Sequence, residues 1–124
     1  MKRLAPALCV ALSLAGCASD VARTPARFVP GADQQSAVLR IREPASLTLP
    51  TGYARPIKRG SVWRFVGAVP HGDVFQPVGD VYTIVGANAH EAYLVLASGL
   101  VVGFYLPGEA AFAPLSDKVR LITE

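Results

Sequence analysis

The stretch "EAYLVLASGLVVGFYLP", residues 91–107, decides the fold. Its nearly continuous apolar run is too short for a membrane-spanning helix, which needs about 20 apolar residues. Ser98-Gly99 in the middle of the run is typical of a two-residue β-hairpin turn. We therefore predict an antiparallel hairpin, with Ala97 opposite Leu100 and Tyr93 opposite Phe104.

The chain from Ser36 onward has the same β character. Short runs of Val, Ile, Leu and aromatic residues are separated by Gly, Pro, Asp and Asn, and no window predicts a long amphipathic helix. Because both faces of the hairpin are apolar, we expect it to be central and covered on both sides. The sequence predicts an all-β fold, a small antiparallel barrel or sandwich, built as a meander of about 6–8 short strands after a flexible N-terminal tether.

The N-terminus differs in composition from the rest of the chain. Lys2 and Arg3 precede an apolar segment, residues 4–15, and this order is typical of a secretory signal peptide. The motif "LAGC", residues 14–17, follows at once and resembles the lipobox of bacterial lipoproteins. Cys9 leaves with the signal, so Cys17 has no partner for an intramolecular disulfide.

The resemblance implies a specific modification. Signal peptidase would cut between Gly16 and Cys17, and the Cys17 thiol would carry a thioether-linked diacylglycerol. Two or three acyl chains anchor a protein stably, since each buried methylene contributes about 0.8 kcal/mol. In the enterobacterial sorting pattern, aspartate directly after the cysteine retains a lipoprotein in the inner membrane. Ala18 takes that place here, with Asp20 farther on, which implies the outer membrane and an orientation toward the periplasm. The alternative is an ordinary signal with an incidental cysteine.

These features divide the chain into three segments. Residues 1–16 are the predicted lipoprotein signal peptide, residues 17–35 the lipidated N-terminus and linker, and residues 36–124 a small β domain. The linker prediction depends on its prolines, its glycine and its lack of any hydrophobic period. Phe28 and Val29 are the exception, because they could instead dock onto the domain.

Charge and motifs exclude several classes of function. Removing the signal lowers the formal net charge from +3 to +1, because two basic residues go with it, so nucleic acid is not an expected partner. The chain has no G-x-S-x-G elbow, P-loop, G-x-G-x-x-G or CxxC motif, and a lipidated Cys17 is not a nucleophile. We expect no enzymatic activity and no cofactor other than the covalent lipid.

Two histidines are the weak candidates for a metal site. His71 with Asp73, and His90 with Glu91, offer nitrogen and carboxylate ligands of the types that metals prefer. Their spacing matches no metal-binding signature. A shared site requires their two loops to converge, so no metal is predicted.

The stretch "LPTGYARPIKRG", residues 49–60, is the candidate partner-binding segment. Prolines and glycines interrupt it, and loops carry function more often than strands do. Tyr53 lies close in sequence to Arg55, Lys58 and Arg59, and tyrosine and arginine are enriched at protein interfaces. The alternative is that the tyrosine fills the core and the cations are only solvated.

We therefore expect a membrane-anchored periplasmic lipoprotein, a non-enzymatic binding or structural accessory component of the bacterial cell envelope, with an envelope protein as its partner. Two alternatives remain open. The protein could be a periplasmic inhibitor or immunity protein for a hydrolase or toxin, or a metal-binding protein that uses His71 and His90.

Overall fold

The fold is described by a computed structural model that covers residues 20–32 and 37–124. Every regular element in these residues is a β-strand, so the predicted all-β class is confirmed. None of these residues belongs to a helix long and apolar enough to cross a membrane. The predicted signal peptide, with Gly16 and Cys17, lies outside the described residues.

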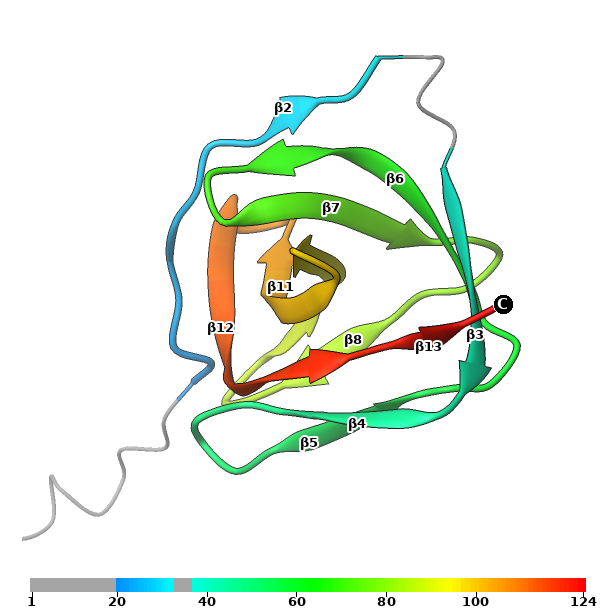
Figure 1. The fold of residues 1–124 in the computed structure, drawn as a ribbon. Helices are drawn as coiled ribbons and strands as arrows, with labels where there is room; N and C mark the ends of the chain where they lie inside the picture. The colour runs from blue at the N-terminus through cyan, green and yellow to red at the C-terminus, as the bar shows by residue number, and fades with distance from the viewer. Residues whose placement is uncertain (1–19, 33–36) are drawn as a thin grey trace, which may run out of the picture.

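One large antiparallel sheet dominates the fold (Figure 1). Its strand order is β1-β12-β11-β10-β7-β6-β3-β13, with β2 paired to β6 off this path. Its longer strands are β3 (Val38–Glu43), β6 (Val62–Val69), β7 (Gly72–Pro77), β10 (Tyr93–Ala97), β11 (Leu100–Leu106) and β12 (Ala111–Arg120). The short β13 (Ile122–Thr123) follows β12 after one residue and pairs with β3, so the sheet curls around on itself.

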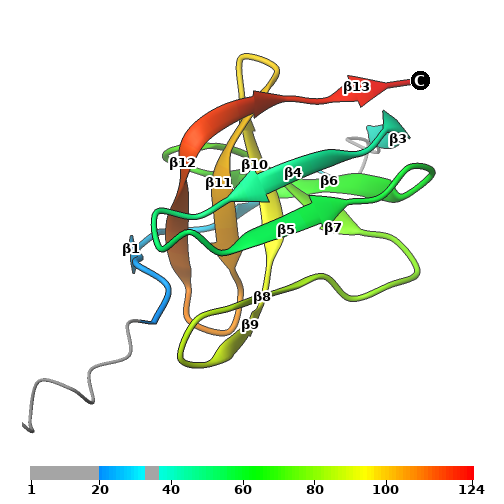
Figure 2. The same cartoon turned by 90° about the horizontal axis from the view of Figure 1, so that it is seen from below.

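Two hairpins interrupt the predicted meander. They are β4 (Ala45–Thr48) with β5 (Ala54–Ile57), and β8 (Thr83–Val85) with β9 (Ala89–Glu91). Leu47, Ile57 and Ile84 from these hairpins are fully buried in the same core as Trp63 and Phe104 of the large sheet. The arrangement is therefore sandwich-like, with a core between the large sheet and the two hairpins (Figure 2).

The central hairpin has the predicted turn. Ser98 and Gly99 adopt positive φ values of 53° and 79°, which is the backbone of a type I′ turn and matches the right-handed twist of its strands. Ala97 lies opposite Leu100, as predicted. The hairpin is also covered on both sides, because side chains from its two faces belong to two separate buried clusters.

The register farther from the turn differs from the prediction. A β-bulge shifts the pairing between Val95 and Leu96 and leaves Val102 as an extra residue on β11. The predicted pairing of Tyr93 with Phe104 is therefore wrong by one residue. The observed pairs beyond the bulge are Tyr93 with Tyr105, Leu94 with Phe104, and Val95 with Gly103.

Residues 20–32, here called the N-terminal strap, lie along the domain rather than apart from it. Within the strap, β1 (Thr24–Pro25) pairs with β12 and β2 (Val29–Pro30) pairs with β6. The Phe28 ring stacks on Tyr105 with centroids 5.3 Å apart, and so covers the outer face of the sheet. Part of the predicted linker thus docks, which was the alternative expectation for Phe28. Val29 pairs through its backbone but remains 55% exposed.

Candidate ligand-binding cleft

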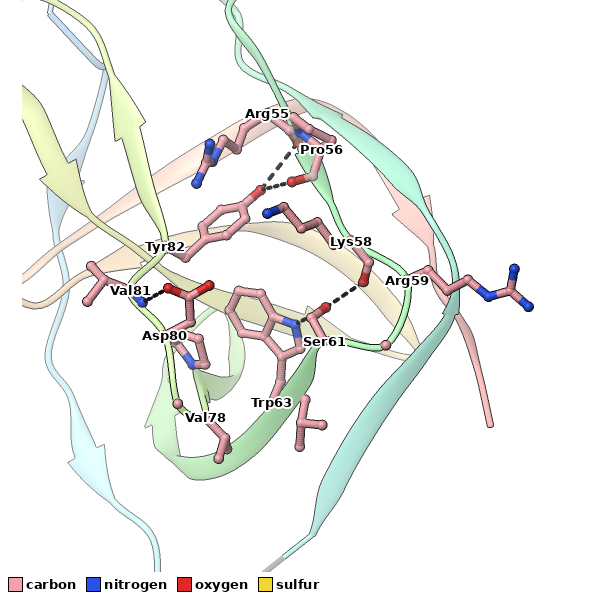
Figure 3. A pocket seen from close by; sticks show the side chains of 14 residues that line it. Arg55, Pro56, Lys58, Arg59, Ser61, Trp63, Val78, Asp80, Val81 and Tyr82 are labelled. Atoms are coloured by element: carbon pink, nitrogen blue, oxygen red, sulfur yellow. Dashed lines mark hydrogen bonds between the residues drawn. The ribbon is translucent and has the colours of Figure 1, made fainter.

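A cleft of about 370 Å³ lies between the connection from β5 to β6 and the connection from β7 to β8 (Figure 3). Three of the four residues predicted to bind a partner line it, namely Arg55, Lys58 and Arg59. The Arg59 side chain points outward from its edge (Figure 3). Tyr53 does not line the cleft. It is half-buried and packs against the main core, which is the alternative that the sequence left open.

The floor of the cleft is aromatic. Trp63 on β6 is only 1% exposed and Tyr82 is 7% exposed, and their rings meet edge to face with centroids 5.1 Å apart. Alternation along β6 turns Trp63 inward while Arg64 points to solvent. The two rings form a rigid apolar surface beneath the basic side chains.

The turn that carries Lys58 and Arg59 is held by the floor. The indole N–H of Trp63 donates a hydrogen bond to Ser61 Oγ over 3.2 Å, and the Ser61 hydroxyl donates to the carbonyl oxygen of Lys58 over 2.6 Å. Gly60 provides the left-handed backbone that this tight turn needs, with φ of 83°. Trp63 and Ser61 therefore hold the turn that carries Lys58 and Arg59 in place (Figure 3).

Tyr82 joins the two sides of the cleft. Its hydroxyl reaches the carbonyl oxygens of Arg55 and Pro56 on β5, at 3.2 and 3.3 Å. Burial raises the pKa of Tyr82 well above its ordinary value, against the opposing effect of the nearby Arg55. The phenol therefore stays protonated and remains a hydrogen-bond donor across the cleft.

Arg55 offers an oriented cation. Its guanidinium carbon lies 4.8 Å from the centroid of the Tyr82 ring, a distance at which the ring face attracts a positive charge. The Nε atom is buried and has no hydrogen-bond partner among the described residues. The Tyr82 ring orients the Arg55 guanidinium at the cleft.

The cleft has a positive balance and an apolar rim. Asp80 is the one acidic residue among its described lining residues, and its carboxylate accepts a hydrogen bond from the backbone N–H of Val81 over 2.7 Å. Val78 and Val81 are 39% and 61% exposed. Three cations against one carboxylate favour an anionic ligand, and the valines favour one with an apolar part.

The predicted metal candidates are not brought together. His71, in the turn between β6 and β7, stacks on Phe112 with ring centroids 3.8 Å apart. His90, on β9, contacts carboxylates other than the neighbouring Glu91. Within residues 20–32 and 37–124, no three His, Cys, Asp or Glu side chains form a group suited to hold a metal ion.

His90 instead bridges the carboxylates of Asp20 and Glu109, an arrangement that no local sequence pattern predicts. Its Nε2 atom lies 3.1 Å from both carboxylate oxygens of Asp20, and its Nδ1 atom lies 3.0 Å from Glu109. Burial opposes a charged ring, but the hydrogen bonds to the two carboxylates outweigh it, so the pKa of His90 is raised above 6.5. The hydrogen bond from His90, followed by one from the Val21 backbone, holds the pKa of Asp20 well below its ordinary range.

The bridge fastens the start of the N-terminal strap to the domain. Asp20 also accepts hydrogen bonds from the backbone and side-chain amides of Asn88 over 3.2 and 3.3 Å. It forms an ion pair with Arg23 over 3.1 Å. Val21, the next residue, is 3% exposed in the main core. Asp20 and Val21 are thus held against the domain.

No protein family matches the chain, and no curated protein and no solved structure is similar to it at a significant level.

Proposed function

We propose that the protein is a lipid-anchored lipoprotein of the bacterial envelope that works by binding a partner rather than by catalysis. Support for the anchor comes from the order of basic residues, apolar segment and "LAGC" motif at residues 14–17. Ala18 after the cysteine favours the outer membrane, with the domain in the periplasm. The partner is an envelope protein, and the protein acts as an accessory component.

The observation that carries the binding role is the cleft. Arg55 and Lys58 lie beside the buried rings of Trp63 and Tyr82, and Arg59 lines the edge of the cleft with its side chain directed outward (Figure 3). A concave surface that combines an apolar floor with a few oriented polar groups is the usual form of a binding site. Arginine and aromatic residues are also the side chains that most often dominate binding energy at interfaces.

The anchor is tested through Cys17. Cys17→Ser should abolish incorporation of radiolabelled palmitate and release the protein from the membrane fraction, because serine offers no thiol for the thioether bond. Alanine at Cys9 is the matched control and should leave labelling unchanged, because that residue is in the removed segment. Labelling that persists in Cys17→Ser contradicts the lipoprotein assignment.

The binding role is tested by crosslinking in cells. A photoreactive amino acid at position 58, whose side chain lies in the cleft (Figure 3), should capture one envelope protein in a defined ratio, whereas the same group at exposed position 118 should not. Equal capture from both positions contradicts the cleft as the binding surface. Capture of a soluble hydrolase that loses its activity in the complex would assign the inhibitor role instead.

A further inference from the structure

We infer that the cleft receives an acidic segment of a partner protein, in which carboxylates stand beside an apolar side chain, and that the N-terminal strap holds the cleft away from the anchoring membrane. The inference rests on the proposed function for the anchor, but the chemistry of the cleft stands without it. Two sets of observations carry it, the unpaired charges of the cleft and the attachment of Asp20.

The basic groups of the cleft are available for a ligand. Among the described residues, the ion pairs involve Arg23, Arg40 and His90, and none involves Arg55, Lys58 or Arg59. A guanidinium matches the geometry of a carboxylate and can donate two parallel hydrogen bonds to it. Stacking on Tyr82 orients the Arg55 guanidinium before any ligand arrives.

The apolar rim selects among anions. A free inorganic anion would satisfy the cations but leave the exposed side chains of Val78 and Val81 uncovered. A polypeptide segment with an apolar residue next to its carboxylates covers both. Burying valine surface contributes roughly in proportion to the apolar area removed from water, so such a segment uses the whole cleft.

The position of Asp20 separates a protein ligand from the lipid headgroups of the anchoring membrane. Three peptide steps join Cys17 to Asp20, a reach of about 10 Å at full extension. The strap begins on one side of the domain, and the connections that form the cleft lie on the opposite side in both views (Figures 1 and 2). A domain of about 100 residues is roughly 30 Å across.

With the start of the strap nearest the membrane, the cleft lies farther from the headgroups than the Debye length of about 8–10 Å at physiological salt. A free linker over residues 17–35 would reach about 25 Å as a coil and would let the cleft turn back to the membrane. Because Asp20 is bound to His90 and Asn88, that freedom is lost. The positive cleft faces the aqueous side, where a protein partner is.

The test measures binding of a fluorescein-labelled peptide of alternating Glu and Leu to the full mature chain in neutral detergent. Its matched probe is the peptide with Gln in place of Glu. We expect the Glu peptide to bind at least about tenfold more tightly than the Gln peptide, and to lose about tenfold in affinity when Lys58→Glu and Arg59→Glu are combined. Both residues are exposed, so this variant should fold.

The control variant combines Lys118→Glu with Arg120→Glu, which changes net charge equally but does not alter the cleft lining. It should bind the Glu peptide within about twofold of the wild type. Equal binding of the two peptides, or an equal loss in the control variant, overturns the inference. So does binding to phosphatidylglycerol vesicles without binding to the Glu peptide, because that result assigns the cleft to a membrane surface.

The result of the peptide-binding test can be distinguished from the result of the lipid-anchor test. Mass spectrometry of the N-terminus in the same preparation reports whether Cys17 is lipidated. A lipidated protein that ignores the peptide contradicts the ligand class alone. An unlipidated protein that binds the peptide contradicts the anchor and leaves the cleft chemistry in place.

Discussion

His90 holds the N-terminal strap between two carboxylates, and replacing it with glutamine tests that attachment. A doubly protonated imidazole donates one hydrogen bond to Asp20 and another to Glu109. Glutamine has its donors on a single amide group, so it reaches one carboxylate at most. We expect His90→Gln to loosen the strap while leaving the two hydrophobic clusters intact.

The size of the effect follows from burial. Removing a buried hydrogen-bonding side chain costs about 1–3 kcal/mol, and the His90 side chain is only 3% exposed. Part of each carboxylate remains in water, so solvent screening reduces the loss for His90→Gln to about 1–2 kcal/mol. For a domain of this size that corresponds to a decrease of about 5–10 °C in Tm.

The effect depends on pH in a defined direction. The pKa of His90 is raised in the folded protein, so its contribution is complete below the ordinary value of 6.5 and is lost as pH rises through the folded value. A neutral ring has one N–H, so one of the two carboxylates then faces a lone pair. The free energy of unfolding should therefore differ most between wild type and variant near about pH 6, and least near about pH 9.

Two assays measure the loss of stability and the opening of the strap. Trp63, the only tryptophan of the chain, reports global unfolding by fluorescence, and trypsin cleavage after the exposed Arg23 and Arg27 reports opening of the strap. Cleavage of wild type, normalised to a peptide substrate, should accelerate as pH rises, and His90→Gln should be cleaved faster at about pH 6. His71→Gln, which alters the other histidine, is the matched control. A stability difference that is identical at both pH values would refute the reasoning.

Two further predictions concern a close backbone approach at Gly67 and a hydrogen bond of Tyr82. Gly67→Ala would place a Cβ atom 2.4 Å from the Val29 carbonyl oxygen. We expect the free energy of unfolding to fall by about 1–3 kcal/mol and tryptic cleavage of the strap to become faster. Gly108→Ala is the control and should have little effect, because its added Cβ would have no heavy atom within 4 Å. Tyr82→Phe removes the hydroxyl that reaches the Arg55 carbonyl oxygen. Urea denaturation should show a free energy of unfolding lower by about 1 kcal/mol. A variant as stable as wild type would contradict a stabilising role for that hydrogen bond.

The central hairpin shows how far local sequence predicts this fold. Ser98-Gly99 and the apolar runs beside it determine the turn and the first pair, because these preferences act over a few residues. The bulge at Val102 depends on β12, which lies beyond the hairpin. Gly103 packs so close to β12 that an added Cβ would lie 2.4 Å from the Ala113 carbonyl oxygen. A pattern limited to two strands does not contain that constraint.

The candidate site divides in the same way. Composition was enough to select Arg55, Lys58 and Arg59 as candidate binding residues, because cations in a segment broken by proline and glycine are a local signal. The structure places Arg55 on β5 and the other two in the connection that follows. The aromatic floor was not separable from the core in the sequence, since Trp63 and Tyr82 are buried like any core residue. Only the folded chain brings the segment around Tyr82 against β5 and creates a concave surface.

The sequence by itself determined the β class and the turn of the central hairpin, because turn residues and apolar runs are readable within a short window. A signal motif is equally local, and the lipid attachment at Cys17 stays a prediction from it. Tertiary structure alone decided that the chain is bound to the domain at Asp20. Asp20 and His90 are separated by 70 positions, and neither carries a local sign of its partner. Their hydrogen bonds convert part of a predicted tether into a strap, since the buried imidazole and the partly exposed carboxylate meet only when the chain has folded.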